Sequence, residues 1–241
     1  CEPRIERKLR DVAGRVVKQW DARLWALQVI DPQAPASLTT THALNDIALR
    51  SDSSDAGVQV RLPGLAGQTL FNWDSRGTCR EIAYDDLLRP VAVFEEGTGV
   101  PRRCAERFAY GRPGFGEALR NQLGQLIRHD DPAGSVLFEQ FAITGQCCEN
   151  TRHFALDPVV PDWPDADVER KVPLESEGAP TQWRFSPQGS VLEHVDAAGH
   201  RHLRLPGEAQ RFEPAPWRFV RRAEMRTAAF AEPFGSRLQH D

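Results

Sequence analysis

The sequence predicts an all-β protein made of stacked antiparallel β-hairpins. A glycine is followed seven positions later by an aspartate and ten positions later by a second glycine, and this frame occurs in full three times. The run between the glycines has the usual length of a strand, which at roughly 3.3 Å per residue spans about 20 Å. Turns spaced about ten residues apart leave no room for crossover helices. The complete copies are Gly67-Asp74-Gly77, Gly124-Asp131-Gly134 and Gly189-Asp196-Gly199.

Two degenerate copies of the frame extend the pattern. One begins at Gly14, with Asp21 as its acid and Leu24 at the closing position; the other begins at Leu88, with Glu95 and Thr98. The third position after the opening residue is aliphatic in every copy: Val17, Leu70, Val91, Ile127 and Leu192. A unit this small cannot bury its own apolar face, so neighbouring units are expected to stack into one continuous core.

The closing Asp-x-x-Gly segment has the chemistry of a turn. An aspartate side chain accepts hydrogen bonds from backbone groups two residues on, and glycine adopts the positive φ that ends the turn. Two further turns are expected, at Arg10–Arg15 and at Thr144-Gly145.

The first half of the chain follows the repeat with one ambiguous segment. The first unit spans residues 4–30, where 24–30 is compatible with a strand or a short helix, because periodicity does not decide between them. Residues 31–35 are predicted to form a loop, since each proline disfavours helix at the residue before it. Residues 41–62 read as two short strands around a turn at 52–57.

The second half contains two interruptions. A strand is expected at 103–110, followed by an inserted loop at 111–116. The proline-rich stretch 156–182 is expected to be an irregular connection anchored by Trp163, and repeat character returns at 183–199. Two domains follow: a repeat segment at 1–205 and a divergent tail at 206–241, which has no further Asp-x-x-Gly. The tail is expected to be a cap of the array, a disordered segment or unrelated sequence.

Composition restricts the classes of partner. Apolar residues make up 40% of the chain and charged residues 27%, with a net charge of −4, so no nucleic-acid or anionic-membrane partner is expected. No apolar run reaches about 18 residues, so direct membrane insertion is not expected either. The first residues have no apolar signal-peptide core and no initiator methionine, which suggests a piece of a longer product or a trimmed chain.

No residue is predicted to be catalytic, to bind a cofactor or to bind a metal. His129-Asp130-Asp131 contains metal-ligand residue types, but Asp131 belongs to the turn and adjacent strand residues point to opposite faces. His194 and Asp196 occupy the equivalent unit and are interpreted in the same way. The histidine-pair and Gly-x-Ser-x-Gly motifs of hydrolases are absent, and residues 111–116 lack the Gly-Lys-Ser/Thr of a phosphate loop. The chain is therefore predicted not to be an enzyme.

Cysteines and tryptophans allow alternative interpretations. The five cysteines fit no zinc spacing; Cys147 and Cys148 are expected to be two small strand residues, with a vicinal redox disulfide as the alternative. The six tryptophans are expected to pack in the sheet, although exposed aromatic rings such as Trp73 or Trp163 would suit a glycan platform.

The turns resemble the YD repeats of the RHS family. Tyr84-Asp85-Asp86-Leu87-Leu88-Arg89 follows the Tyr-Asp-x-x-Gly-Arg form except at Leu88, and Arg10–Arg15 keeps the Gly-Arg without the tyrosine. Over about residues 5–205 the chain is similar to the N-terminal part of the C component of bacterial insecticidal toxin complexes. The segments that carry this resemblance are 21–24, 48–57, 84–96, 124–134, 145–146, 151–154 and 161–164.

The resemblance implies a function in encapsulation. The C component and its partner, the B component, form a hollow β-shell that encloses a C-terminal toxic segment, and a self-cleaving aspartate site releases that segment inside the shell. No segment here matches the cleavage region or a toxic domain, so the expectation is a non-catalytic, truncated shell segment, secreted as part of a toxin complex. Its expected partners are the rest of the RHS shell and the B component. The alternatives are an adhesin-like module that binds a glycan or host protein and, third, a hydrolase built on scattered Asp and His residues, among them Asp131.

Overall fold

The computed structural model describes residues 4–157, 161–204 and 211–213. The chain divides into two compact units. The first comprises Cys1–Ala109, His129–Ala133 and Asp157–Pro173, and the second comprises Tyr110–Arg128, Gly134–Leu156 and Leu174–Asp241.

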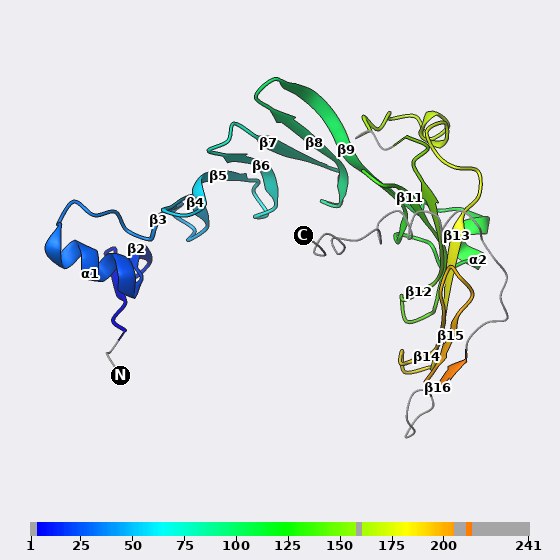
Figure 1. Ribbon diagram of the computed structural model, residues 1–241. Helices are drawn as coiled ribbons and strands as arrows, with labels where there is room; N and C mark the ends of the chain where they lie inside the picture. Colours follow the sequence, from blue (N-terminus) through cyan, green and yellow to red (C-terminus); the bar gives the residue numbers. More distant parts are fainter. Residues whose placement is uncertain (1–3, 158–160, 205–210, 214–241) are drawn as a thin grey trace, which may run out of the picture. The chain divides into compact units, whose positions relative to one another are not determined.

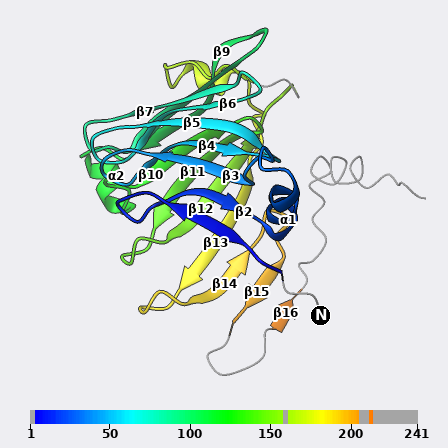
Figure 2. The same ribbon diagram turned by 90° about the vertical axis from the view of Figure 1, so that its left-hand side faces the viewer.

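The first unit is a run of antiparallel strands in which chain order and sheet order coincide (Figures 1 and 2). Figure 2 shows β4 to β7 lying side by side. The strands are β1 (Arg7–Arg10), β2 (Val16–Trp20), β3 (Leu38–His42), β4 (Ala48–Ser53), β5 (Gly57–Pro63), β6 (Thr69–Asp74), β7 (Cys79–Tyr84), β8 (Pro90–Gly97) and β9 (Val100–Tyr110). The second unit continues the same plan with β11 (Gly134–Phe141), β12 (Cys147–Phe154), β13 (Ala179–Phe185), β14 (Val191–Val195), β15 (Arg201–Leu203) and β16 (Arg211–Glu213). The all-β prediction of paired antiparallel strands is therefore confirmed.

One hairpin turn recurs through the described residues. The N–H of its first residue donates to the carbonyl of the residue four positions on, at 2.7–3.1 Å, and the N–H of its fourth residue donates back at 2.9–3.2 Å. The fourth residue has φ between 59° and 85°, which gives a turn closed by a left-handed residue. These turns begin at Asp11, Ala43, Gly64, Asp74, Asp85, Ala142, Ser186 and Asp196. Neighbouring register shifts, between Leu9 and Arg10 for example, mark the bulge that accompanies such turns.

Three parts of the predicted repeat are wrong. Asp21 does not begin a β-turn; its carboxylate accepts the N–H of Leu24 at 2.8 Å and caps helix α1 (Ala22–Ile30), which decides the ambiguous segment in favour of helix. Glu95 lies inside β8 opposite Arg103, so the following turn depends on Gly99. Gly124 closes no two-strand hairpin, because helix α2 (Phe115–Leu119) interrupts the connection and Gly124 N–H donates to Gly111 O.

Helix α1 gives the N-terminal strands a small core of their own. Leu24 on the helix and Trp20 on β2 are buried, and the rings of Trp20 and Trp25 meet edge to face with centroids 6.5 Å apart. The guanidinium of Arg7 lies 4.6 Å from the Trp25 centroid. The helix thus covers apolar surface that the short strands β1 and β2 leave exposed.

Strand β10 (Leu126–Asp131) contributes residues to both units, and a long connection precedes β13. The described part of that connection contains one short 3₁₀ turn, η1 (Glu169–Lys171). The domain boundary expected at residue 205 stays a prediction, because most of the 206–241 tail lies outside the described residues.

Candidate functional site

A polar cluster of the first unit is formed with residues 161–173, which we call the strap. Trp163 is only 1% exposed, and its indole N–H donates to the carbonyl of Asp131 at 3.2 Å. Arg107 on β9 donates through Nε to the Trp163 carbonyl at 2.9 Å. Trp163 therefore packs inside the unit and cannot serve as an exposed glycan platform, which corrects that part of the sequence interpretation.

A buried ion pair fixes the other end of the strap. Arg170 Nη1 lies 2.8 Å from Asp130 Oδ2, and the Asp130 side chain is fully buried. Arg170 Nη2 also lies 3.4 Å from Asp167 Oδ1. A charge removed from water is tolerated when it is paired and hydrogen-bonded, so this contact ties the strap to β10.

The side chains of His129, Asp130 and Asp131 have separate partners and do not converge on one site. The His129 ring stacks on Phe108 with centroids 4.5 Å apart, and its Nε2 lies 3.0 Å from Glu106 Oε2. Asp130 pairs with Arg170, whereas Asp131 Oδ1 accepts the N–H of Ala133 in the turn. No group of three or more His, Cys, Asp or Glu side chains in the described residues could hold a metal ion.

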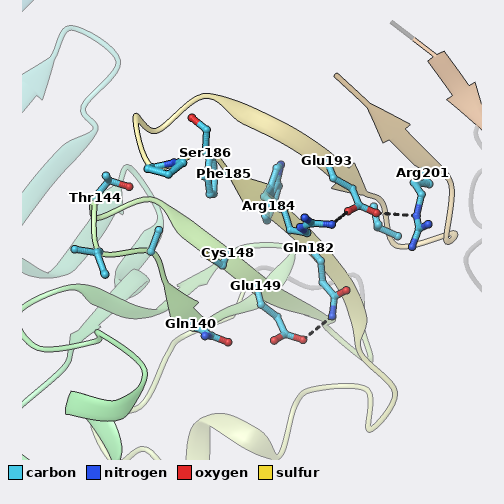
Figure 3. A pocket seen from close by; sticks show the side chains of 15 residues that line it. Gln140, Thr144, Cys148, Glu149, Gln182, Arg184, Phe185, Ser186, Glu193 and Arg201 are labelled. Carbon is cyan, nitrogen blue, oxygen red and sulfur yellow. Dashed lines mark hydrogen bonds and ion pairs between the residues drawn. The ribbon is translucent and has the colours of Figure 1, made fainter. Parts of the chain in front are cut away.

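In the second unit, a groove of about 880 Å³ lies over β11 to β15 (Figure 3). Glu193, which is largely buried, lies at one side between two arginines: Arg184 Nη1 is 3.0 Å from Oε2 and Arg201 Nε is 2.7 Å from Oε1. Gln182 donates to Glu149 at 3.0 Å on the neighbouring strand pair. These contacts link β12 with β13 and β13 with β14 and β15, and they pair Glu193 with both arginines that line the groove.

His194 and Asp196 also have structural contacts. His194 lies between the rings of Trp183 and His202, with centroid distances of 5.1 and 5.7 Å. Asp196 starts a hairpin turn and accepts the backbone N–H groups of Ala198 and His200 at 2.9 Å each. Burial alone would raise the pKa of Asp196, but the hydrogen bonds from His200 outweigh it and lower that pKa.

The four described cysteines are free thiols, so the expected strand placement of Cys147 and Cys148 holds without a vicinal disulfide. Burial raises the pKa of both thiols, and it does the same for Cys104. Thiolates are the reactive form of cysteine, so these groups are held in their less reactive state.

Two clusters had no recognisable sequence signal. Arg170 stands in the charged run Glu169-Arg170-Lys171, and Glu193 lies in an ordinary strand. The partner of Arg170, Asp130, is forty positions away, and Glu193 meets Arg184 and Arg201 only through the pairing of β13, β14 and β15, so the fold is needed to identify both clusters.

No helix in the described part of the chain has both the length and the apolar character needed to cross a bilayer.

No protein-family model matches the sequence, and a search of curated proteins finds no match. Solved structures do match. The crystal structures of TcdB2-TccC3-Cdc42 and of TcdB2-TccC3 each align with a TM-score of 0.78 and 23% sequence identity, over 87% of this chain and 11% of theirs. The Photorhabdus luminescens Tc holotoxin pore, which carries a TccC3 mutation, aligns with a TM-score of 0.77 and 23% identity, over 87% of this chain and 10% of that one.

The chain has the fold of the part of the toxin-complex structures that it matches. The resemblance inferred from the sequence is thereby confirmed in its fold. The chain spans about a tenth of the length of the structures that it matches.

Proposed function

We propose that this chain is a non-catalytic structural segment of an RHS-type toxin-complex shell, equivalent to the N-terminal part of a C component. The observation that carries the proposal is the alignment of 87% of the chain with structures of TcdB2-TccC3. In this proposal the chain is secreted within a toxin complex and joins the rest of the RHS shell and the B component. Together they enclose a C-terminal toxic segment.

The polar clusters support a structural function. Asp130 and Glu193 are buried acids that bind arginines on other elements, and His129 and His194 are stacked on aromatic rings. A general base needs to reach a substrate proton. A buried carboxylate that is paired with guanidinium groups is not positioned for this, and its pairing connects parts of the fold. We therefore assign no catalytic residue. The side chain of Asp131 accepts a backbone hydrogen bond in its β-turn.

A segment exchange tests the proposal. The equivalent segment of a C component from a toxin complex is replaced by residues 4–204, and the hybrid is co-expressed with its B component. We expect a stable complex by native mass spectrometry, in which the enclosed segment resists added protease. The control lacks the segment altogether. A hybrid that no longer binds the B component, or that leaves its cargo as sensitive to protease as the control does, contradicts the proposal.

One observation favours a second candidate function, glycan binding. Trp73 on β6 is 37% exposed and stacks on Phe71, with ring centroids 5.3 Å apart. Exposed aromatic rings contribute apolar contact area together with a polar edge. Glycan-array binding that is lost in Trp73→Ala would support this candidate, and an array without binding would exclude it.

A further inference from the structure

The strap forms hydrogen bonds with the edge of strand β9 at the point where strand β10 no longer accompanies it. Strand β9 has eleven residues and β10 has six, so β10 is too short to accompany β9 along its whole length. On its other side, β9 pairs with β8 from Val100 to Arg107. Glu106 still contacts His129 of β10 at 3.0 Å, which places the strap contacts at Cys104 just beyond the β10 contacts.

Both backbone groups of Cys104 are bound by the strap. The Cys104 N–H donates to Asp162 Oδ1 at 2.7 Å, and the Cys104 carbonyl accepts the N–H of Trp163 at 3.0 Å. One acceptor and one donor are what a neighbouring strand would supply at this position. Here the acceptor is a side chain, so the strap replaces a strand with only two residues.

The residues on either side prevent the strap from acting as a strand itself. Pro161 and Pro164 flank the pair Asp162-Trp163, and neither proline has an N–H to donate. Proline is found at edges because it ends a hydrogen-bonded ladder. The buried Trp163 ring and the Arg170–Asp130 pair then hold the segment in place.

We propose that the strap is an intramolecular edge cap, in which Asp162 and Trp163 prevent a second copy of this chain from adding an extended segment to β9 at Cys104. Unpaired N–H and C=O groups on a strand edge are a template for pairing with another chain, and proteins cover such edges with loops. The inference needs no toxin-complex partner, so its test is independent of the proposed function.

Hydrogen exchange and molar mass test the cap in the full chain. The Cys104 amide of the wild type is expected to exchange as slowly as the amides of the β8–β9 ladder. In Asp162→Ala the acceptor is lost, and we expect at least about tenfold faster exchange at Cys104, as for a lost charge-assisted hydrogen bond. Light scattering is expected to show a larger self-associated fraction than in the wild type at equal concentration.

Asp165→Ala is the matched control. Asp165 also belongs to the strap and binds Arg107 at 2.8 Å, but its side chain is 95% exposed, and the acceptor of the Cys104 N–H is Asp162. We expect its exchange at Cys104 and its molar mass to equal those of the wild type. Fast exchange of Cys104 in the wild type overturns the proposal without any variant. In folded Asp162→Ala, unchanged exchange or unchanged association overturns it as well.

Discussion

Two turns of the first unit, Asp11–Arg15 and Asp85–Arg89, have the same contacts but differ at the residue that closes them. In each, Oδ1 of the aspartate accepts the N–H groups of the third and fifth residues at 2.9–3.0 Å. Oδ2 binds Nε of the arginine at 2.7 Å in the first turn and at 2.8 Å in the second. The left-handed position is Gly14 with φ 84° in one turn and Leu88 with φ 59° in the other.

The aspartate and arginine contacts stabilise the formed turn, whereas glycine at the fourth position lowers the conformational cost of forming it. The aspartate and arginine bind both ends of the turn, and they do so equally well around a leucine. Glycine lowers the conformational cost of the left-handed position, which for other L-residues is about 1–2 kcal/mol. The turn therefore tolerates Leu88, and it forms with the same contacts although its sequence lacks the glycine.

The largest expected loss of stability is at Gly134, where both the positive φ and the close approach of another strand require glycine. A Cβ on Gly134 would clash with the His153 carbonyl oxygen, and φ at Gly134 is +135°. We expect Gly134→Ala to lower the free energy of unfolding by about 3 kcal/mol or more, since strand β12 must move away. Gly14→Ala is the control: its Cβ would meet nothing within 4 Å, so only the backbone cost of about 1 kcal/mol is expected. Equal losses in chemical denaturation would contradict this distinction.

Removal of the acid should affect both turns alike. Asp85→Ala and Asp11→Ala each lose two backbone acceptor contacts and an arginine pair. We expect each to lower the thermal midpoint by a few degrees, as for the loss of a helix cap. The control Asp86→Ala changes a neighbouring acid that does not cap the turn. If Asp86→Ala destabilises the protein as much as Asp85→Ala, the aspartate does not hold the turn.

The pH dependence of stability also tests whether the Asp85 carboxylate holds its turn. The side-chain and backbone hydrogen bonds of Arg89 lower the pKa of Asp85. A carboxylate with a lowered folded pKa contributes stability that is complete above its unfolded pKa of about 3.9 and is lost as pH falls through the folded pKa. The stability difference between wild type and Asp85→Ala should therefore be constant above about pH 5 and should shrink below about pH 4. A difference that grows on acidification would argue against the hydrogen-bonded carboxylate.

The sequence predicted the turns whose signal is local. Asp74-x-x-Gly77 and Asp196-x-x-Gly199 combine a capping acid with a residue suited to positive φ, and both form as expected. The turn at Ala43–Asp46 has neither an acid first nor a glycine fourth, so no local sequence signal predicts it. Arg15 supports that turn from the neighbouring hairpin, by donating to the Ala43 carbonyl at 2.8 Å.

Other features could not be predicted from the local sequence. For Asp21 the reason is that one sequence signal is compatible with two local structures. An aspartate that accepts an N–H three residues on suits a helix start as well as a turn, and Asp21 forms the helix start. Arg170 and Asp130 are forty positions apart, so their pairing depends on the path of the whole connection. The burial of Trp163, which belongs to the strap, depends on that same path.

The most direct test of the shared turn is the free energy of unfolding of Leu88→Gly. The account predicts a gain of about 1 kcal/mol, because glycine relieves the left-handed backbone while the Asp85 and Arg89 contacts remain. Leu87→Gly, at an exposed position without positive φ, should give no gain. A loss of stability in Leu88→Gly would contradict the claim that Asp85 and Arg89 hold this turn and that its fourth position requires only a left-handed residue.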